Sequence, residues 1–461
     1  MTKDPAAPHS SRARRGPPQR GRGWAIDTTP LRNRPFRRLF WGVAATMLGQ
    51  QMTLVAVPFQ VFALTGSSLL VGVTSIVALV PLIVFGLLGG AIADTMDRRR
   101  LMLITSWGAA LSSALLAVQA LLPGGGNLVL LWVLTACVSG FAAVNQPTRS
   151  AAVPALVGRE GVPAANALTM TVRHVFVIGG PLLAGLLISL GDLFVTYAVD
   201  AVGFVVAAVL LRGLPALPPR STTEPVRLMA AVRGVGEGFV FLRTQPVLLM
   251  TFVVDIIAML FAWPQAVFPE LSETRYADTP NSLGWLFVGI SIGALLMGLT
   301  SGWVSRVDRQ GAVVLGAIVV WALAIIGFGL APSLWLAVLC LAVAGAGDMV
   351  SAVLRTSMLL EAAPEEMRGR MQGVFLVVVA GGPRLGDLRA GAMASAAGVS
   401  VAMVSGGIVV VVAMLVVALL VPSFRRFRAS RVPHEEILAG RARPDSSAPE
   451  SDEGRPGPGV H

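Results

Sequence analysis

Lysine is nearly missing from this sequence of 461 residues: Lys3 is the only one, and every other Lys or Arg position is an arginine. A Walker A loop holds the phosphates of ATP with a lysine that follows a glycine-rich turn. Lys3 follows no such turn, so ATP hydrolysis by that route is excluded. Any activity that needs energy therefore depends on a gradient or on the ATPase of a partner.

Charged residues and cysteine are scarce as well. Only 13% of the residues are charged and 54% are hydrophobic, and the mean hydropathy is +0.73. A soluble domain carries about 25% charged residues, so the composition indicates a polytopic membrane protein. Cys137 and Cys340 lie in separate apolar stretches without metal-ligand or redox spacing. We expect both to be buried small hydrophobic residues, and we expect neither a metal nor a cofactor.

The formal net charge of +11 at neutral pH raises the question of nucleic-acid binding. The arginines, however, cluster in the tails and in short segments between apolar runs, which is how the orientation of a membrane protein is encoded. We therefore expect no nucleic-acid partner. Residues 1–35 are basic and proline-rich, and no apolar h-region follows them directly. They predict a disordered tail and not a cleavable signal peptide.

Apolar runs long enough to cross a bilayer as a helix fill most of the chain. They predict about twelve spanning helices, near residues 39–63, 69–93, 101–122, 128–148, 168–190, 193–212, 246–268, 283–304, 312–331, 334–358, 372–395 and 400–421. The connecting segments on one side are basic, with Arg98 to Arg100, Arg149 with Arg159, Arg212 to Arg243, Arg306 with Arg309, and Arg368 with Arg370. Those on the other side carry only Arg275. Because basic loops stay inside, both termini are predicted to be cytoplasmic.

These runs predict an all-α membrane protein with two pseudo-symmetric six-helix bundles. The predicted parts are a disordered basic cytoplasmic tail, a first bundle, a cytoplasmic linker with an amphipathic segment, a second bundle and a disordered cytoplasmic tail, at residues 1–35, 36–212, 213–245, 246–422 and 423–461. The sequences of the two predicted bundles resemble each other weakly, since the segment that ends in Arg149 has a counterpart that ends in Arg355. Related halves place a substrate site at their interface, near the middle of the bilayer.

The loop after the second apolar run combines glycine, acid and three arginines within a short stretch, Gly89–Arg100. We interpret Gly90, Asp94, Arg98 and Arg99 as a conformational latch, in which Asp94 pairs with an arginine or a helix N-terminus of the other half. The alternative is a purely topological function of the arginines. Asp94 favours the latch, because acids contribute little to orientation.

Ionisable residues inside apolar runs are the candidates for coupling or for lining a cavity, since such residues rarely face lipid. The candidates are Asp255, Asp348, Asp387, Arg149, Arg173 and Arg355, with Asp200, Arg384 and Arg389 also inside predicted spans. A carboxylate among them would bind a proton when desolvated and release it when open to water or facing an arginine. The alternative is structural ion pairs. We expect such a pair for Arg384 with Asp387, and a solvated side chain for His174.

Several of these segments resemble a known family. The spacing Gly90-x-x-x-Asp94-x-x-x-Arg98 is similar to the signature loop of the major facilitator superfamily. Three further segments resemble the bacterial efflux branch that includes the enterobactin exporter and macrolide-efflux-like proteins. They are Gln146-Pro147-x-Arg149-x-Ala151-Ala152-x-Pro154, Ala165-Asn166-Ala167-Leu168 and Pro364-Glu365-Glu366-Met367-Arg368-Gly369-Arg370. Gly180, Pro181 and Gly185 resemble the antiporter motif of exporters, with Ala184 in place of a usual glycine, and they predict a hinge in the fifth helix.

The resemblance implies a secondary transporter of the bacterial inner membrane, multi-pass and embedded in the lipid bilayer. We expect a proton-coupled exporter of small amphiphilic molecules, such as drugs or siderophore-like metabolites, that works by alternating access. Uptake of a sugar or another nutrient and a membrane sensor that transports nothing remain as alternatives. An enzyme is not expected, because the sequence has no phosphate loop or metal-ligand cluster.

Overall fold

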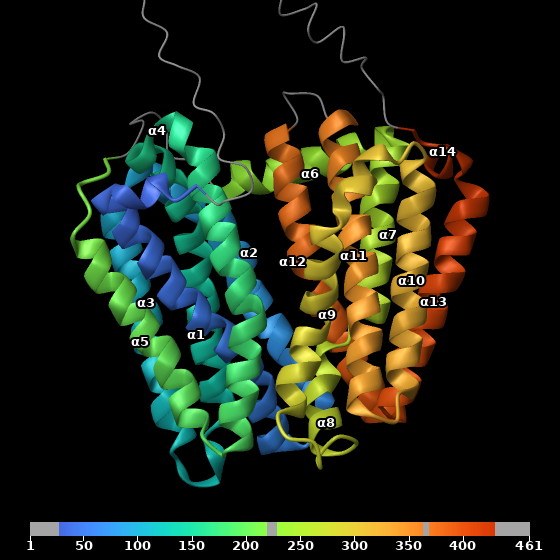
Figure 1. Ribbon diagram of the computed structural model, residues 1–461, viewed down its shortest axis with the longest axis horizontal. Coiled ribbons are helices and arrows are strands. Elements are labelled where there is room, and N and C mark those ends of the chain that lie inside the picture. The colour runs from blue at the N-terminus through green and yellow to red at the C-terminus, as the bar shows by residue number, and fades with distance from the viewer. Residues whose placement is uncertain (1–26, 219–227, 363–367, 429–461) are drawn as a thin grey trace, which may run out of the picture.

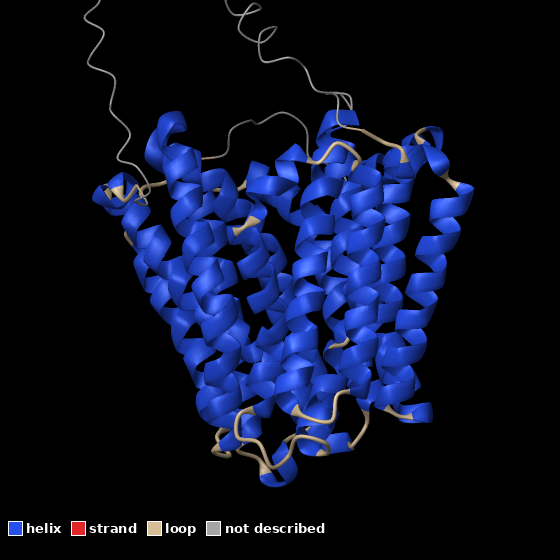
Figure 2. Cartoon of the chain, turned by 45° about the vertical axis from the view of Figure 1, so that its right-hand side comes forward, coloured by secondary structure: helices blue, strands red, loops and turns tan. Residues whose placement is uncertain are grey.

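The computed structural model describes residues 27–218, 228–362 and 368–428, and in these ranges it contains helices and no strands (Figure 2). The longer helices are α1 (Arg34–Thr65), α2 (Ser68–Thr95), α3 (Arg98–Ala120), α4 (Leu128–Ser189), α5 (Leu193–Arg212), α6 (Leu228–Thr244), α7 (Pro246–Ala262), α9 (Ser282–Leu299), α10 (Gln310–Leu330), α11 (Leu334–Ala362), α12 (Arg368–Ala397) and α13 (Val399–Leu420). The short elements are η1 (Thr29–Arg32), η2 (Pro123–Gly125), η3 (Gln265–Val267), α8 (Phe268–Glu273), η4 (Ser301–Arg306) and α14 (Pro422–Arg425). The all-α membrane fold is confirmed.

Ten helical stretches of the described chain are long and apolar enough to cross a membrane. One of them, α4, has 62 residues, about three times the length that a bilayer requires. α12 is not among the ten, and its apolar sequence is interrupted by Arg384, Asp387 and Arg389. The count of twelve spanning helices therefore stays a prediction.

The loop predicted between the fourth and fifth apolar runs is wrong. The chain is helical on both sides of Gly158, the one residue inside α4 whose backbone is not helical, with φ 72° and ψ 167°. Glycine tolerates this positive φ without steric strain, so a single residue is enough to redirect the helix. Arg149 and Arg159 consequently lie on α4 and not in a loop.

The helices form two groups that stand side by side (Figure 1). In the first group, α1 and α3 pack on α5, and α2 packs on α4. In the second group, α9 and α10 pack on α11, α13 on α10, and α12 on α7. The start of α1 and α14 lie at the upper end of Figure 1, here called the upper face, and α8 lies at the opposite end, the lower face.

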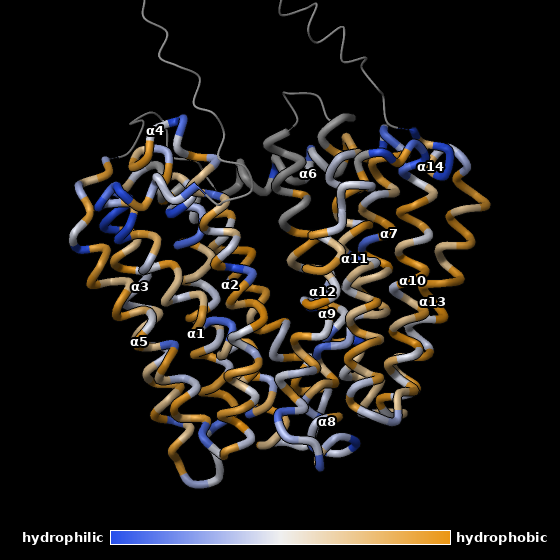
Figure 3. The backbone as a smooth tube through the Cα atoms, viewed as in Figure 1, coloured by the Kyte–Doolittle hydropathy of each residue, from blue (hydrophilic) through white to orange (hydrophobic). Residues whose placement is uncertain are grey.

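Hydrophobic residues dominate the middle of the helices, and hydrophilic residues gather toward the two faces (Figure 3). Large apolar side chains are exposed on the outside of both groups, among them Leu111, Leu339 and Val412 at 63%, 60% and 52% exposure. Such a surface is stable in hydrocarbon and not in water. The prediction of two buried cysteines is wrong for Cys137, which is exposed, while Cys340 is half-buried. An apolar residue of a membrane protein can face lipid, so hydrophobicity does not imply burial inside the protein.

Candidate functional site

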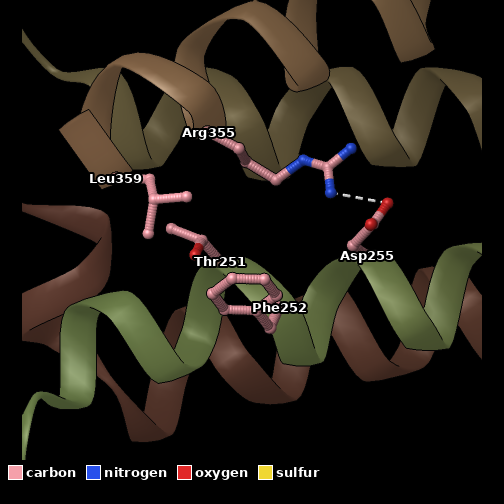
Figure 4. A pocket seen from close by; sticks show the side chains of 5 residues that line it. All are labelled: Thr251, Phe252, Asp255, Arg355 and Leu359. Carbon is pink, nitrogen blue, oxygen red and sulfur yellow. Dashed lines mark ion pairs between the residues drawn. The ribbon is translucent and has the colours of Figure 1, made fainter. Parts of the chain in front are cut away.

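An ion pair joins α7 and α11 inside the second group. Nη1 of Arg355 lies 2.5 Å from Oδ1 of Asp255, and the two side chains point at each other (Figure 4). Nη2 of Arg355 lies 4.0 Å from Oδ1 of Asp348, and Nε donates to Ser351 Oγ at 3.1 Å. The sequence predicts that Asp348 and Arg355 share one face of a helix, and the structure adds the carboxylate of α7 as the nearer partner of the arginine.

The same ion pair lines a small pocket. The other lining residues are Thr251, Phe252 and Leu359, so one charged contact is surrounded by apolar groups and one hydroxyl (Figure 4). Only 13% of the Arg355 side chain and 7% of the Asp255 side chain are exposed. An ion pair withdrawn from water in this way loses its attraction when the carboxylate takes up a proton. The arrangement therefore places a charged contact at the packing of α7 on α11.

Arg149 is the counterpart of Arg355 in the first group, but its partner differs. Its two terminal nitrogens each lie 3.3 Å from Thr46 Oγ1 of α1. No carboxylate forms an ion pair with Arg149 among the residues that the structure describes. A half-buried guanidinium is thus held by a neutral hydroxyl, and its positive charge is available to an anion.

Asp387 of α12 lies between the two groups. Its Oδ2 accepts a hydrogen bond from Ser75 Oγ of α2 at 2.7 Å, and its Oδ1 accepts one from the Ala266 N–H of η3 at 3.0 Å. The Ala266 N–H is free because α7 ends before Pro264, which cannot continue the helical hydrogen bonds. Asp387 thereby links α2 of the first group to two elements of the second.

The predicted local pair of Arg384 with Asp387 does not form as a direct ion pair. Nη1 of Arg384 donates to the Ala380 carbonyl one turn earlier at 3.2 Å, and the described part of the chain shows no ion pair between the two residues. The carboxylate instead uses both of its oxygens for donors on α2 and η3. Residues three apart on a helix are neighbours, but the side chain of Asp387 points toward the donors on α2 and η3.

Further contacts close the lower face between α2 and the second group. Ser68 Oγ donates to Glu270 Oε2 of α8 at 2.5 Å, and the Leu69 N–H donates to Ser395 Oγ of α12 at 3.0 Å. The backbones approach so closely that a Cβ on Gly391 would collide with the Ser68 carbonyl oxygen. These contacts involve the first residues of α2 and the last part of α12, so they form a seal across the lower face.

The residues of the predicted helix-five hinge lie at a second contact between the groups. The α4 backbone stays helical through Gly180, Pro181 and Gly185. Asn281, at the start of α9, donates from Nδ2 to the Leu182 carbonyl at 3.1 Å, and a Cβ on Gly185 would meet the Asn281 side chain and the backbone of α9. The small residues therefore permit close packing of α4 on α9, and bending at Pro181 stays a prediction.

The predicted latch is described only in part. Gly90 and Asp94 lie in the last turns of α2, but their side-chain positions are outside the described part of the structure. Arg98 is buried, with Nη1 3.5 Å from the Ala151 carbonyl of α4, and Arg99 Nη2 donates to the Arg212 carbonyl at 2.5 Å. Both arginine contacts stay within the first group, so a contact across to the other half stays a prediction for Asp94 alone.

Arg173 is not brought to the other candidates. It is exposed on α4 beside the equally exposed His174. Arg149, Arg355 with its two carboxylates, and Asp387 lie on different helix pairs, so the candidates form three separate clusters and not one continuous network.

Asp200 of α5 is a buried acid that the sequence places inside the membrane but whose environment it does not reveal. Its Oδ2 accepts hydrogen bonds from Thr53 Oγ1 of α1 at 2.9 Å and from Ser113 Oγ of α3 at 2.8 Å. Glu270 and Asp97 also have tertiary partners that the sequence analysis missed. Single serine partners and backbone donors carry no pattern in a sequence, so these contacts could not be predicted.

Two packed helical groups, a seal across one face and charged residues inside the hydrocarbon-length helices define a membrane transporter of the major facilitator type. The chain belongs to the transmembrane secretion effector family, whose model matches residues 25–442. The resemblance to this superfamily is thereby confirmed.

Relatives and solved structures agree with this assignment. The chain is 29% identical over 375 residues to the enterobactin exporter EntS of Shigella boydii serotype 4 and to that of Escherichia coli O1:K1, which covers 81% of this chain and 88% of each exporter. Its fold is similar to that of the nucleoside transporter NupG, with a TM-score of 0.66 at 13% identity over 85% of this chain and 99% of that one. A bacterial homologue of the iron transporter ferroportin in an inward-facing state gives a TM-score of 0.63 at 17% identity over 86% and 99%.

Proposed function

We propose that this protein is a proton-coupled exporter of small amphiphilic molecules of the siderophore type, working by alternating access in the bacterial inner membrane. The observation that supports coupling is the contact between Asp255 and Arg355, in which a carboxylate and a guanidinium face each other inside the second group. The likeness to enterobactin exporters along most of the chain supports the direction of transport and the substrate class.

The coupling step is the exchange of a proton for an ion pair at Asp255. With the carboxylate charged, Arg355 is held at 2.5 Å and α7 is tied to α11. A proton on Asp255 removes this attraction, and Arg355 is left 4.0 Å from Asp348. The arginine can then turn toward Asp348 or toward a substrate anion, and the packing of α11 on α7 loosens.

The asymmetry between Arg149 and Arg355 supports the proposed substrate class. Arg355 is neutralised by Asp255, whereas Arg149 is held by the hydroxyl of Thr46 and by no other side chain that the structure describes. A substrate that presents a negatively charged oxygen would find a hydrogen-bonded, partly desolvated cation at Arg149. Apolar parts of the same substrate would pack against side chains such as Phe252 and Leu359.

The described conformation is closed at the lower face by the contacts of α2 with α12 and of α4 with α9. If the arginine-rich upper face is cytoplasmic, as the distribution of basic residues predicts, the structure is an inward-facing state. Export then requires the seal at Ser75 and Asp387 to open while the groups approach each other at the upper face.

Efflux from proteoliposomes tests the proposal. Purified protein would be reconstituted with a preloaded catecholate siderophore, an uncharged dye and a sugar, with and without a pH gradient. We expect gradient-dependent efflux of the anionic catecholate at a rate at least tenfold above that of protein-free vesicles. Gradient-driven accumulation of the sugar would instead show uptake, and the absence of any flux would favour a sensor.

Substitution of the unpaired arginine separates substrate binding from coupling. In Arg149→Gln, binding of the anionic catecholate should fall about ten- to hundredfold, because a charge-assisted hydrogen bond contributes roughly 1.5–3 kcal/mol. Binding of the uncharged dye should stay within twofold. The matched control is Arg173→Gln, which removes an exposed arginine of the same helix. Equal weakening of both ligands by Arg149→Gln would contradict the proposed anion site.

A further inference from the structure

The chain that follows α5 runs back over the upper face of the first group. We call residues 213–218 the strap. Leu214 and Leu217 are only 3% and 7% exposed, and they share one apolar cluster with Phe36 of α1, Met102 of α3 and Leu156 of α4. The strap is therefore packed onto three helices of the first group as an integral part of its surface.

The loop between α2 and α3 holds the strap by its backbone. Oδ2 of Asp97 accepts a hydrogen bond from the Leu217 N–H at 2.9 Å, and the Arg98 N–H donates to the Leu217 carbonyl at 3.0 Å. Oδ1 of Asp97 accepts from the Arg100 N–H at 3.0 Å and caps α3. One carboxylate thus fixes the start of a helix and the backbone of a distant segment at once.

Two arginine side chains hold the beginning of the strap. Arg99 Nη2 donates to the Arg212 carbonyl at 2.5 Å, and Arg38 of α1 donates to the Gly213 carbonyl. The last carbonyls of a helix have no partner inside it, so cations placed there are favourable both as donors and as charges. Every contact of this set joins elements of the first group.

We propose that Asp97, Arg98 and Arg99 form a clasp that makes the strap a rigid part of the first group, so that this group moves as one body up to Pro218 during transport. The charged loop then has a function within its own half, in addition to any contact of Asp94 with the other half. The inference rests on the movement of two bundles, which is part of the proposed function, and it does not depend on the substrate or on protons.

Thiol labelling of a buried strap residue tests the clasp directly. Leu214→Cys would be made in a background with Cys137→Ala and Cys340→Ala, and its reaction with a maleimide measured in purified, detergent-solubilised protein. We expect slow labelling with Asp97 present and at least tenfold faster labelling with Asp97→Asn. Asp97 uses one oxygen for the Arg100 N–H and the other for the Leu217 N–H. In asparagine one of these oxygens becomes an NH2 group, which would face an N–H donor, so one of the two contacts is lost.

The matched control is Asp192→Asn. Asp192 caps α5 by accepting from the Val195 N–H at 2.9 Å in the same way that Asp97 caps α3, but it is bonded to no distant segment of the described chain. Labelling of Leu214→Cys should be unchanged in this control. An unchanged rate in Asp97→Asn, or an equal rise in both variants, would overturn the proposal.

A second variant covers the case in which Asp97→Asn fails to fold. Asp97→Ser keeps a short hydroxyl that can cap α3 but that does not reach Leu217, and it should also raise labelling about tenfold. Transport in vesicles is measured separately: we expect it to fall several-fold in Asp97→Asn and not in Asp192→Asn. Loss of transport in the parent protein would count against the proposed function alone, because the labelling rates report on the clasp without any flux.

Discussion

A charge inside a membrane helix is tolerated when a second charge or a set of hydrogen-bond donors lies within reach, and three aspartates of this chain show three solutions. Asp255 has an arginine at 2.5 Å. Asp387 has a hydroxyl and a backbone N–H from two elements, and Asp200 has two hydroxyls on one oxygen. Only the first is an ion pair, so loss of charge should affect the three residues differently.

Replacing Asp255 with asparagine should uncouple transport from the pH gradient. The amide cannot exchange a proton, and its dipole attracts Arg355 less strongly than a full charge does. We expect gradient-driven efflux to fall at least tenfold, while exchange of labelled for unlabelled substrate without a gradient stays within about threefold of the parent. Both rates can be measured in the same proteoliposomes.

Asp348→Asn is the control for this experiment, because its oxygen lies 4.0 Å from Arg355 and contributes less to holding the guanidinium. We expect a smaller loss of driven efflux than in Asp255→Asn. If the two variants behave alike, or if Asp255→Asn keeps full gradient dependence, Asp255 is not the coupling residue.

Asp200 should tolerate asparagine but not valine. Asparagine keeps an acceptor oxygen for Thr53 and Ser113 and removes the desolvation penalty of a charge that has no cationic partner among the described residues. Valine would leave two buried hydroxyls without their acceptor, at about 1–3 kcal/mol each. We expect the thermal midpoint of Asp200→Asn in detergent to stay within a few degrees of the parent, and that of Asp200→Val to fall markedly.

The opposite order of stability would show that the charge of Asp200 is required.

The sequence alone predicts that Asp255, Asp387 and Asp200 avoid lipid, since each lies in an apolar run. It could not predict their partners, because the nearest partner of Arg355 lies on α7, one hundred residues away in the chain. Hydrophobic periodicity in a sequence identifies the face that a single helix buries. It does not determine how one helix is rotated relative to another.

At the scale of helices, the contact of α2 with α12 decides which face is closed. The side chains that bridge it are Ser68, Ser75, Asp387 and Ser395 together with Glu270 of α8. Hydroxyl to carboxylate contacts of this kind are individually weak, at about 0.5–1.5 kcal/mol for a neutral bond and more for a charged one. A seal made of several such bonds can hold the closed state and still open within a transport cycle.

Ser75→Ala should weaken the seal by one hydrogen bond. The loss of about 1 kcal/mol corresponds to a roughly fivefold change in the ratio of closed to open molecules. Spin labels on the lower ends of α2 and α12 should show a larger population of long distances by pulsed electron resonance. The matched control is Thr74→Ala on the neighbouring position, because Thr74 contacts Trp132 within the first group. An equal shift in both variants would mean that Ser75 has no specific effect on closure.

The helices themselves were largely predictable, and the exceptions have local causes. Long apolar runs predict α1, α3, α5, α10 and α13 close to where they lie. The interval between the fourth and fifth runs contains Pro154 and Pro163, which favour a loop, yet both lie inside α4. Each proline lacks only one backbone donor, and the packing of the helix outweighs that loss.

At the scale of the whole molecule, the superfamily was predictable because it depends on features that repeat along the chain: apolar length, loop charge and the signature loop. Which face is closed was not, because apolar length and loop charge are the same whichever face the helices close. The choice of closed face depends on contacts such as that of Leu69 with Ser395, which no local sequence pattern predicts. Which face is closed is therefore information that only the arrangement in space provides.

A crosslink across the seal should stop transport without stopping binding. The Leu69 N–H and Ser395 Oγ lie 3.0 Å apart, which brings the start of α2 against α12, so Leu69→Cys with Ser395→Cys, in a chain without Cys137 and Cys340, is the pair to oxidise across the seal. Under oxidation we expect efflux to fall more than tenfold and to return on reduction. Substrate binding in detergent should persist, because the upper face stays accessible.

The control disulfide joins helices within one group. Thr74→Cys with Trp132→Cys replaces a pair that is hydrogen-bonded between α2 and α4, and two helices of one bundle keep their contact if bundles rock as rigid bodies. Its oxidation should therefore leave efflux near the parent rate. If the crosslink from Leu69 to Ser395 forms and efflux continues at the parent rate, the lower face does not open during transport, and alternating access by rocking of the two groups is wrong for this protein.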